Sequence, residues 1–266
     1  MFQRIILATL VIGSTSGALY IYYLHRSLRQ EIHHESQNSI PDSILPSPSN
    51  LRTNKSRILH SLPRQVFLNP GEFVICYDIA TKSLPRSSLP KSLHEDAAEM
   101  LTVYLRHNMT IFSKWMLQSW VLKHILKAPR QRESFNPEVI QRLHFTQGDL
   151  VNGVYAVLHC SVGSTLDLRW AQVEFGMQME GMEKMDGRLV CGVEIREGVE
   201  KGEAEGEVTF YSQTVQWTKR DTQTGKGDMV LPLERGSMRW LNQLASWGLL
   251  RSGVRMLVEI KKREKS

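Results

Sequence analysis

Residues 5–24 of this 266-residue chain (IILATLVIGSTSGALYIYYL) form a continuous run without a charged side chain. Each residue of an α-helix rises ~1.5 Å, so a helix of about 20 apolar residues spans the hydrocarbon core of a bilayer. Tyr20, Tyr22 and Tyr23 lie at the far end of the run, where aromatic rings prefer the headgroup region. The run therefore predicts a transmembrane anchor, preceded by a short tail at residues 1–4.

The same run is also compatible with a cleaved signal peptide. Arg4 precedes the apolar residues, and the small residues Ser16 and Ala18 lie where a peptidase would cut. Because the apolar run continues to Leu24, we favour the anchor. Gly13 and Gly17 form a GxxxG spacing, which allows two membrane helices to approach closely. The expected partners are therefore the lipid bilayer and, at these glycines, a membrane protein or a second copy.

The orientation in the membrane is left open by the distribution of Lys and Arg, which lie on both sides of the run. The three cysteines, all in strand-like apolar runs, do not form a disulfide framework and favour a cytosol-facing domain. Asn54 and Asn108 begin glycosylation sequons, which matter if the domain is lumenal. We expect a single-pass protein of the endoplasmic reticulum or another endomembrane.

The remainder of the chain divides into three segments. Residues 25–62 are rich in Ser, Pro, Asn and His and predict a flexible tether. Residues 63–260 predict a single α+β domain, and residues 261–266 a basic tail. The net charge is +6, but no stretch interleaves basic and aromatic residues as a nucleic-acid groove does. We therefore expect the positive charge to lie on a surface that faces anionic lipid, and we do not expect nucleic acid as a partner.

Hydrophobic patterns predict two short strands at residues 64–68 and 71–79, then helices, and then further strands. A Ser92–Glu95 capping box opens one helix, a second covers about 109–127, and Asn136 caps a short third. From Asp149 onward, four runs alternate at period two, and a long apolar helix covers about 236–258. The fold class is α+β: an N-terminal transmembrane helix plus an antiparallel sheet packed on helices. The order is helix-grip-like, with a hot-dog-like arrangement as the alternative.

The C-terminal part of the chain resembles a known family. GDxVxGVY, from Gly148 to Tyr155, and TVQW, followed by the long apolar helix, resemble helix-grip proteins of the UPF0548 type. They also resemble uncharacterised single-pass proteins of filamentous fungi, some associated with secondary-metabolite gene clusters. The resemblance covers about the last 120 residues. It implies a helix-grip fold and a setting in secondary metabolism, but no reaction and no catalytic residues.

His159 and Asp167 are the candidate catalytic pair. A hairpin turn centred on Gly163 would place them opposite each other on neighbouring strands. A carboxylate beside an imidazole raises its pKa, which suits general acid–base chemistry at neutral pH. The alternative is that both are exposed surface residues. No CxxC, HExxH or Gly-rich phosphate loop occurs, so no metal and no cofactor are expected.

Further residues are candidates for the lining of a hydrophobic pocket. These are Tyr155, Glu174, Trp115 and Trp120. The tryptophans equally suit a filled core between helices and sheet, or contact with a membrane surface. Met177, Met179, Met182 and Met185 form either an adaptable apolar lip over such a pocket or a loop packed on the domain.

These observations predict a membrane-anchored protein that carries, or acts on, a hydrophobic small molecule. The molecule would be lipid-like or polyketide- or terpenoid-like, and the setting secondary-metabolite biosynthesis. If the protein is an enzyme, cofactor-free isomerisation, cyclisation or thioesterase-like hydrolysis is expected. The alternative is a non-catalytic membrane accessory or scaffold protein.

Overall fold

A seven-stranded antiparallel sheet lies at the centre of the molecule. The computed structural model describes residues 21–47, 49–50, 55–177, 185–198, 206–221 and 230–264. Neighbouring strands follow the order β1-β2-β7-β6-β5-β4-β3, and every pair is antiparallel. The strands are β1 (His33–Gln37), β2 (Phe73–Pro85), β3 (Leu150–Val151), β4 (Tyr155–Ser164), β5 (Leu168–Met177), β6 (Met185–Arg196) and β7 (Glu207–Lys219). The α+β class and the antiparallel sheet packed on helices are confirmed.

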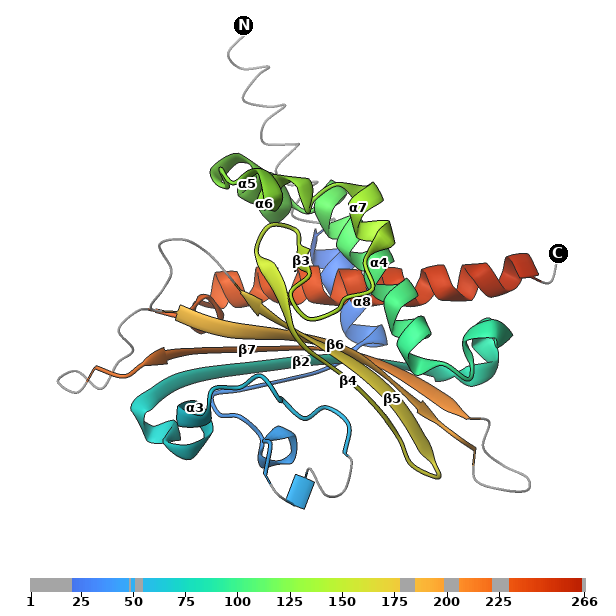
Figure 1. Cartoon of the computed structure of the whole chain (residues 1–266), viewed down its shortest axis with the longest axis horizontal. Helices are drawn as coiled ribbons and strands as arrows, with labels where there is room; N and C mark the ends of the chain where they lie inside the picture. Colours follow the sequence, from blue (N-terminus) through green and yellow to red (C-terminus); the bar gives the residue numbers. More distant parts are fainter. Residues whose placement is uncertain are drawn as a thin grey trace, which may run out of the picture.

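Long helices cover one face of this sheet, and mostly irregular chain covers the other (Figure 1). The helices are α3 (Arg64–Leu68), α4 (Ala97–Trp115), α5 (Leu117–Ile125), α6 (Pro129–Glu133), α7 (Pro137–Arg142) and α8 (Gly236–Glu264). α4 and α8 cross the first face, whereas α3 and the chain that leads to it lie against the second (Figure 1). The sheet is therefore the middle of three layers.

Both faces of the inner strand β7 are buried. Val208 and Phe210 belong to the core under α4 and α8, while Tyr211, Val215 and Trp217 pack into the core on the opposite face. Side chains alternate between the two faces of a strand. The period-two pattern of β7 therefore supplies a residue to each core in turn, and its buried positions are apolar or uncharged on both sides.

Two local predictions need correction. Asp96, and not Ser92, caps α4, because its side chain accepts a hydrogen bond from the Glu99 amide at 2.9 Å. Residues 64–68, a strand-like run in the sequence, form helix α3. The Asn136 cap of α7 is confirmed, since its side chain accepts from the Glu138 amide at 3.0 Å.

The predicted flexible tether at residues 25–62 is wrong where the structure describes it. Residues 21–31 are helical, and Leu28 is fully buried in the core beside α8. β1 adds an edge strand to β2, and Leu59 is fully buried on the opposite face of the sheet. These buried apolar residues are not evident from the sequence, because polar and proline residues separate them. The domain therefore includes chain from residue 21 onward, and α8 extends to Glu264 into the predicted basic tail.

No helix within the described ranges is long and apolar enough to span a bilayer. Residues 1–20, with Gly13 and Gly17, lie outside those ranges. Only residues 21–24 of the predicted anchor are described, and they are helical. The anchor remains a prediction.

Candidate functional site

A cavity of about 180 Å³ lies between the helical layer and the sheet. α4, α5 and α8 supply one wall, and β4, β5, β6 and β7 supply the other. Its apolar lining includes Leu105, Met109, Phe112, Leu122, Val154 and Leu249. Ligand cavities characteristically combine such a lining with a few fixed polar groups, so this is the candidate binding site for an apolar small molecule.

Polar groups lie on two sides of this cavity. Ser212 and Thr214 line it from β7, and Asn242 and Ser246 line it from α8. The Asn242 amide nitrogen is buried and has no hydrogen-bond partner within the described residues. A buried donor without an acceptor costs free energy, so the cavity offers an unsatisfied donor to a ligand oxygen.

The cavity also contains Tyr155, as the sequence analysis predicts, together with Cys191. Burial raises the pKa of Tyr155 to about 12. Burial likewise raises the pKa of Cys191 to about 12, so its thiol is protonated at neutral pH and is a weak nucleophile. These groups suit ligand binding better than proton transfer at neutral pH.

Trp115 and Trp120 do not line the cavity, which corrects their assignment as pocket residues. Their exposed fractions are 77% and 61%. Trp115 ends α4, and Trp120 lies on the outer side of α5, while Leu122 on the same helix faces the cavity. α5 is amphipathic, and its large side chains therefore divide between the cavity and the molecular surface.

Glu174 does not share a cavity with Tyr155, which corrects a second assignment. A bulge between Val157 and His159 shifts the pairing of β4 with β5. An inserted residue reverses the alternation of side chains that follow it. Tyr155 therefore lies on the helical face, whereas His159 and Glu174 lie on the opposite face, close to His60.

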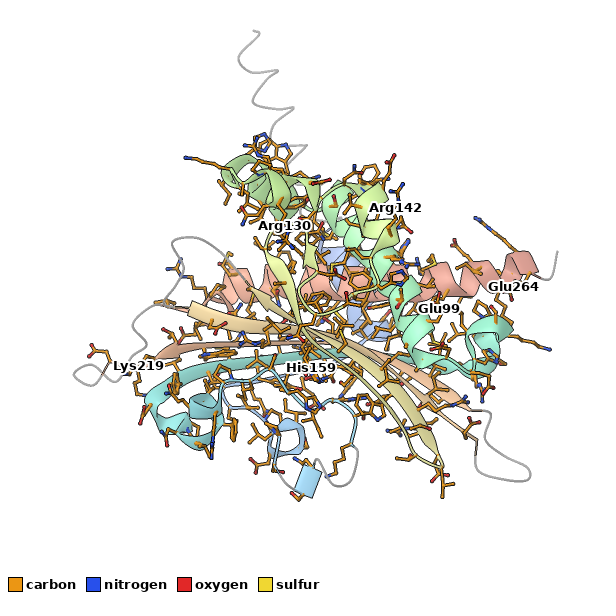
Figure 2. The ribbon with its side chains drawn as sticks, viewed as in Figure 1. Glu99, Arg130, Arg142, His159, Lys219 and Glu264 are labelled. Carbon is orange, nitrogen blue, oxygen red and sulfur yellow. The ribbon has the colours of Figure 1, made fainter. Side chains whose placement is uncertain are left out.

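His159 and Asp167 are not cross-strand partners. The turn covers residues 165–167, so His159 pairs with Glu174, and Asp167 lies exposed in the turn itself. The Asp167 carbonyl accepts a hydrogen bond from the Glu197 amide at 3.1 Å. The expected register is wrong because the hairpin reverses three residues later than Gly163. His159 lies on β4, next to the two-residue strand β3 at one edge of the sheet (Figure 2).

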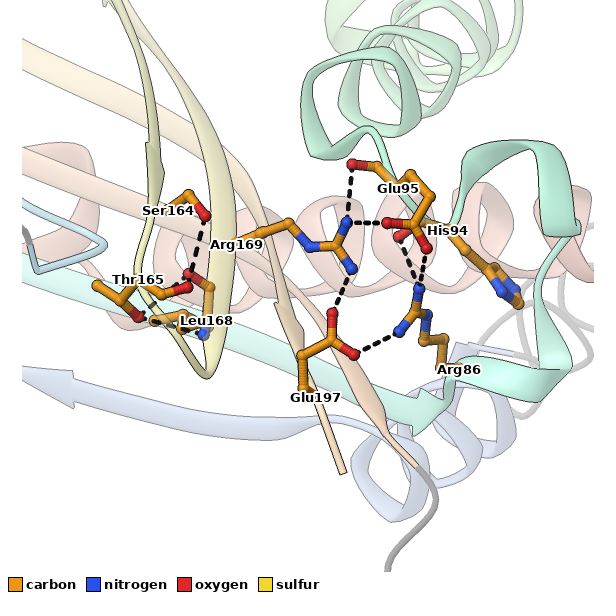
Figure 3. A network of polar contacts seen from close by, with 8 residues as sticks. All are labelled: Arg86, His94, Glu95, Ser164, Thr165, Leu168, Arg169 and Glu197. Atoms are coloured by element: carbon orange, nitrogen blue, oxygen red, sulfur yellow. Dashed lines mark hydrogen bonds and ion pairs between the residues drawn. The ribbon is translucent and has the colours of Figure 1, made fainter. Parts of the chain in front are cut away.

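A network of ion pairs joins the strand ends beside this turn (Figure 3). Arg169 on β5 bonds both Glu95 and Glu197. Arg86 bonds the same two carboxylates, at 2.7 and 2.8 Å. The network joins the start of α4 to the ends of β2, β5 and β6, and its surface position indicates a structural role.

On the face of the sheet opposite the cavity, a buried carboxylate lies beside two imidazoles. Glu174 is fully buried and accepts hydrogen bonds from the amides of His60 and Ser61, each at 2.8 Å, and from Gln172 Nε2 at 3.0 Å. The ring centroids of His60 and His159 lie 4.6 Å apart. Burial lowers the pKa of His60; Glu174 opposes this shift, and His159 adds to it.

His60 is the residue of this cluster that sequence reasoning missed. It lies in the segment interpreted as a tether, 99 residues before His159. No motif spacing links the two histidines. The available signal was the apolar triplet of Ile58, Leu59 and Leu62 around His60, which are all buried.

The structure also bears on the predicted glycosylation sites. Asn108 lies on α4 and is buried against the core, so the folded domain does not present it to a glycosyltransferase. The expectation that Asn108 is a glycosylation site is therefore wrong for the folded domain. Asn54 lies outside the described residues.

Comparison with known proteins adds no further assignment. No family model matches the chain, and no curated protein matches it at a significant level. The fold and the site define an α+β protein with a largely apolar cavity between its sheet and its helices.

Proposed function

We propose that this chain is a membrane-anchored protein that binds and carries a lipid-like or polyketide- or terpenoid-like metabolite. The observation that carries the proposal is the cavity between the sheet and helices α4, α5 and α8. The resemblance to single-pass fungal proteins supports a setting in secondary metabolism, on an endomembrane.

The size of the cavity limits the ligand. Its volume of about 180 Å³ lies below the ~300–1,000 Å³ of ordinary drug-sized pockets. An apolar cavity of ~150 Å³ in another protein accommodates benzene. A single ring or a slender hydrocarbon segment therefore fits, with the rest of a longer ligand outside. Met177 lines the cavity, which supports the methionine lip in part; Met179 and Met182 lie outside the described residues.

Helix α5 supports access from the membrane. Its inner side lines the cavity through Leu122, while Trp120, Val121 and Ile125 are exposed on its outer side. Residues 114–132 contain five Lys and Arg residues and no Asp or Glu. Apolar and aromatic side chains flanked by basic residues are typical of helices that lie at an anionic bilayer surface. In this arrangement α5 separates the cavity from the lipid.

The predicted anchor enters the domain near the same region. Ile21, Tyr22 and His25 form a surface hollow together with Trp240 of α8. Leu122 of α5 and Leu249 of α8 belong to one apolar cluster and line the same cavity. A membrane-embedded segment before residue 21 would hold this end of the domain at the bilayer.

The arrangement also favours the helix-grip-like order over the hot-dog-like one. α8, with 29 residues, crosses the sheet and packs on β2 and β7. α4 packs on β5 and β6 of the same face. The long C-terminal helix is the feature that a helix-grip arrangement requires, and the second helix completes the roof of the cavity.

The test uses the full chain in lipid nanodiscs, titrated with straight-chain fatty alcohols of increasing length and followed by calorimetry. Affinity should rise with chain length until the cavity is filled and then level off. Ala245→Phe places a ring in the cavity and should abolish binding. Gly248→Ala, on the same helix with open space around it, is the matched control. Equal binding by both variants, or no binding by wild type, contradicts the proposal.

The accessory function is the second candidate, and the exposed Trp115 and Trp120 are the observation that favours it. Exposed tryptophans are typical of the residues that contribute most of the binding energy at protein interfaces. If wild type binds no alcohol in the titration while Trp120→Ala releases a membrane partner, the accessory function is the better account.

A further inference from the structure

We propose that His60, His159 and Glu174 form a binding site for one divalent transition-metal ion, with zinc as the best match. The site lies on the face of the sheet that carries α3, so it is separate from the cavity and independent of the function proposed above. Each residue offers one ligand atom, and the three atoms lie within 4.8 Å of one another.

The burial of Glu174 is the first argument. Its carboxylate is fully buried, yet it forms no ion pair with any described residue. Buried charges in proteins are normally paired with an opposite charge or coordinate a metal. Its three hydrogen bonds come from neutral donors, two amides and the Gln172 side chain. A cation is therefore the missing counterpart.

The hydrogen bonds of Glu174 leave one place for a metal. Glu174 Oε1 accepts hydrogen bonds from the His60 amide and from Gln172 Nε2. These two bonds use both lone pairs of Oε1. Oε2 accepts only from the Ser61 amide, so one lone pair remains. The carboxylate can therefore act as a monodentate ligand without losing any existing bond.

The two imidazoles supply the other ligands. Within the described residues, no hydrogen bond to a ring nitrogen of His60 or His159 is found. Both rings are half-buried. Folding therefore removes part of the water around them, and no described residue replaces it with a hydrogen bond to a ring nitrogen. Two histidines and one carboxylate, with a water at an open position, are a ligand set that zinc and ferrous iron share.

The required movement is small. Ligands at ~2.1 Å from a tetrahedral ion lie about 3.4 Å apart, whereas the three atoms here lie within 4.8 Å. Rotation of the imidazoles is the movement that metal binding calls for, and no hydrogen bond from the described residues holds either ring in place. The carboxylate is fixed instead: Tyr211 donates to Gln172 Oε1 at 2.9 Å, and Gln172 in turn holds Glu174. Such an outer layer of hydrogen bonds orients metal ligands.

The test titrates Co²⁺ into the full chain in detergent, purified without a histidine tag and freed of metal by a chelator. One equivalent should give the intense visible bands of a low-coordinate cobalt site, and Zn²⁺ should displace it. His60→Ala and His159→Ala should each weaken binding by at least the roughly 10- to 100-fold that loss of an outer-layer bond costs.

His144→Ala is the matched control, because His144 is exposed and lies outside the cluster; it should bind as wild type does. Circular dichroism melting establishes that each variant is folded, and His159→Gln replaces any His159→Ala that is not. Bands that persist in both cluster variants, or a wild type that gives only the spectrum of free aqueous Co²⁺, overturn the proposal. Neither result affects the alcohol titration, which reports on the cavity.

Discussion

Arg57 and Glu194 form a two-pronged ion pair, with Nε to Oε1 at 2.6 Å and Nη2 to Oε2 at 2.8 Å. Glu194 is almost fully buried on β6, and Ser56 also donates to it at 2.6 Å. Arg57 adopts a left-handed backbone conformation with φ of 68°, which most residues avoid. The pair therefore holds a strained segment against the sheet, directly before His60 and the candidate metal site.

Replacement of Arg57 by Met should lower the free energy of unfolding by about 3–5 kcal/mol, because it leaves the buried Glu194 carboxylate without its counter-ion. Urea denaturation of the detergent-solubilised chain measures this loss. Arg196→Met is the control, since Arg196 is largely exposed and lies 4.0 Å from the same carboxylate; its effect should stay within about 0.5 kcal/mol. Equal losses in the two variants would contradict this account.

Gly192 on β6 should not tolerate a side chain. A Cβ at this position would lie 2.3 Å from the Tyr211 hydroxyl and 2.8 Å from the Ala171 carbonyl oxygen. Tyr211 is fully buried and bonded to Gln172, so it cannot move aside. Gly192→Ala should cost about 1–3 kcal/mol of stability, measured by the same denaturation. Gly71→Ala, which meets open space, should be near neutral; a similar cost there would reject the steric explanation.

The sheet was predictable because each of its C-terminal strands carries a clear period-two pattern. β5 and β7 alternate at period two over much of their length, and antiparallel neighbours follow from the order of the strands along the chain. The β4–β5 register was not predictable. It depends on the bulge after Val157 and on a turn at residues 165–167, and neither has a local sequence signal that distinguishes it from a turn at Gly163.

The candidate site was predictable only in part, for a related reason. His159 and Glu174 are each a candidate from the sequence, but their pairing follows from the bulge. His60 lies in a polar, proline-containing segment whose few apolar residues are stabilised by the sheet and not by any local pattern. Trp115 and Trp120 follow helical spacing, yet spacing alone does not tell whether an apolar side chain faces a core or a membrane.

Asn242→Leu should raise stability and weaken ligand binding at the same time. The variant removes a buried amide nitrogen that has no partner, so the free energy of unfolding should rise by about 1–3 kcal/mol. It also removes the donor that a ligand hydroxyl would use. Calorimetry should find that the variant no longer prefers a fatty alcohol over the alkane of equal length. A destabilised variant would instead indicate that the amide is satisfied in the native state.

Glu31 should make stability depend on pH in the acid range. Burial alone would raise its pKa, but the hydrogen bond from Lys82 at 2.8 Å and the charges of Lys82, Arg251 and Arg255 lower it below the ordinary value of 4.5. The folded state therefore binds this proton more weakly than the unfolded state does. The stabilisation is complete above the unfolded pKa and is lost as the pH falls through the folded pKa.

Comparison of the melting temperatures of wild type and Glu31→Gln across pH isolates this contribution. Wild type should be more stable near neutral pH, and the difference should shrink toward zero in acid once Glu31 is protonated. High salt should also reduce it, because the pair is only partly buried. A difference that is independent of pH would mean that packing of the helix at 21–31, and not the charge, stabilises this contact.

Trp120 should lie in contact with lipid when the full chain is in an anionic nanodisc. Brominated lipids quench tryptophan emission only over short distances, so Trp120→Ala should lower the fraction of emission that they quench. Because the side chain is exposed, stability should change by no more than about 0.5 kcal/mol. Trp170→Phe is the control, since Trp170 is buried against β6 on the sheet, and its loss should leave the quenchable emission unchanged. An equal effect of both variants would place α5 away from the bilayer and remove the membrane route to the cavity.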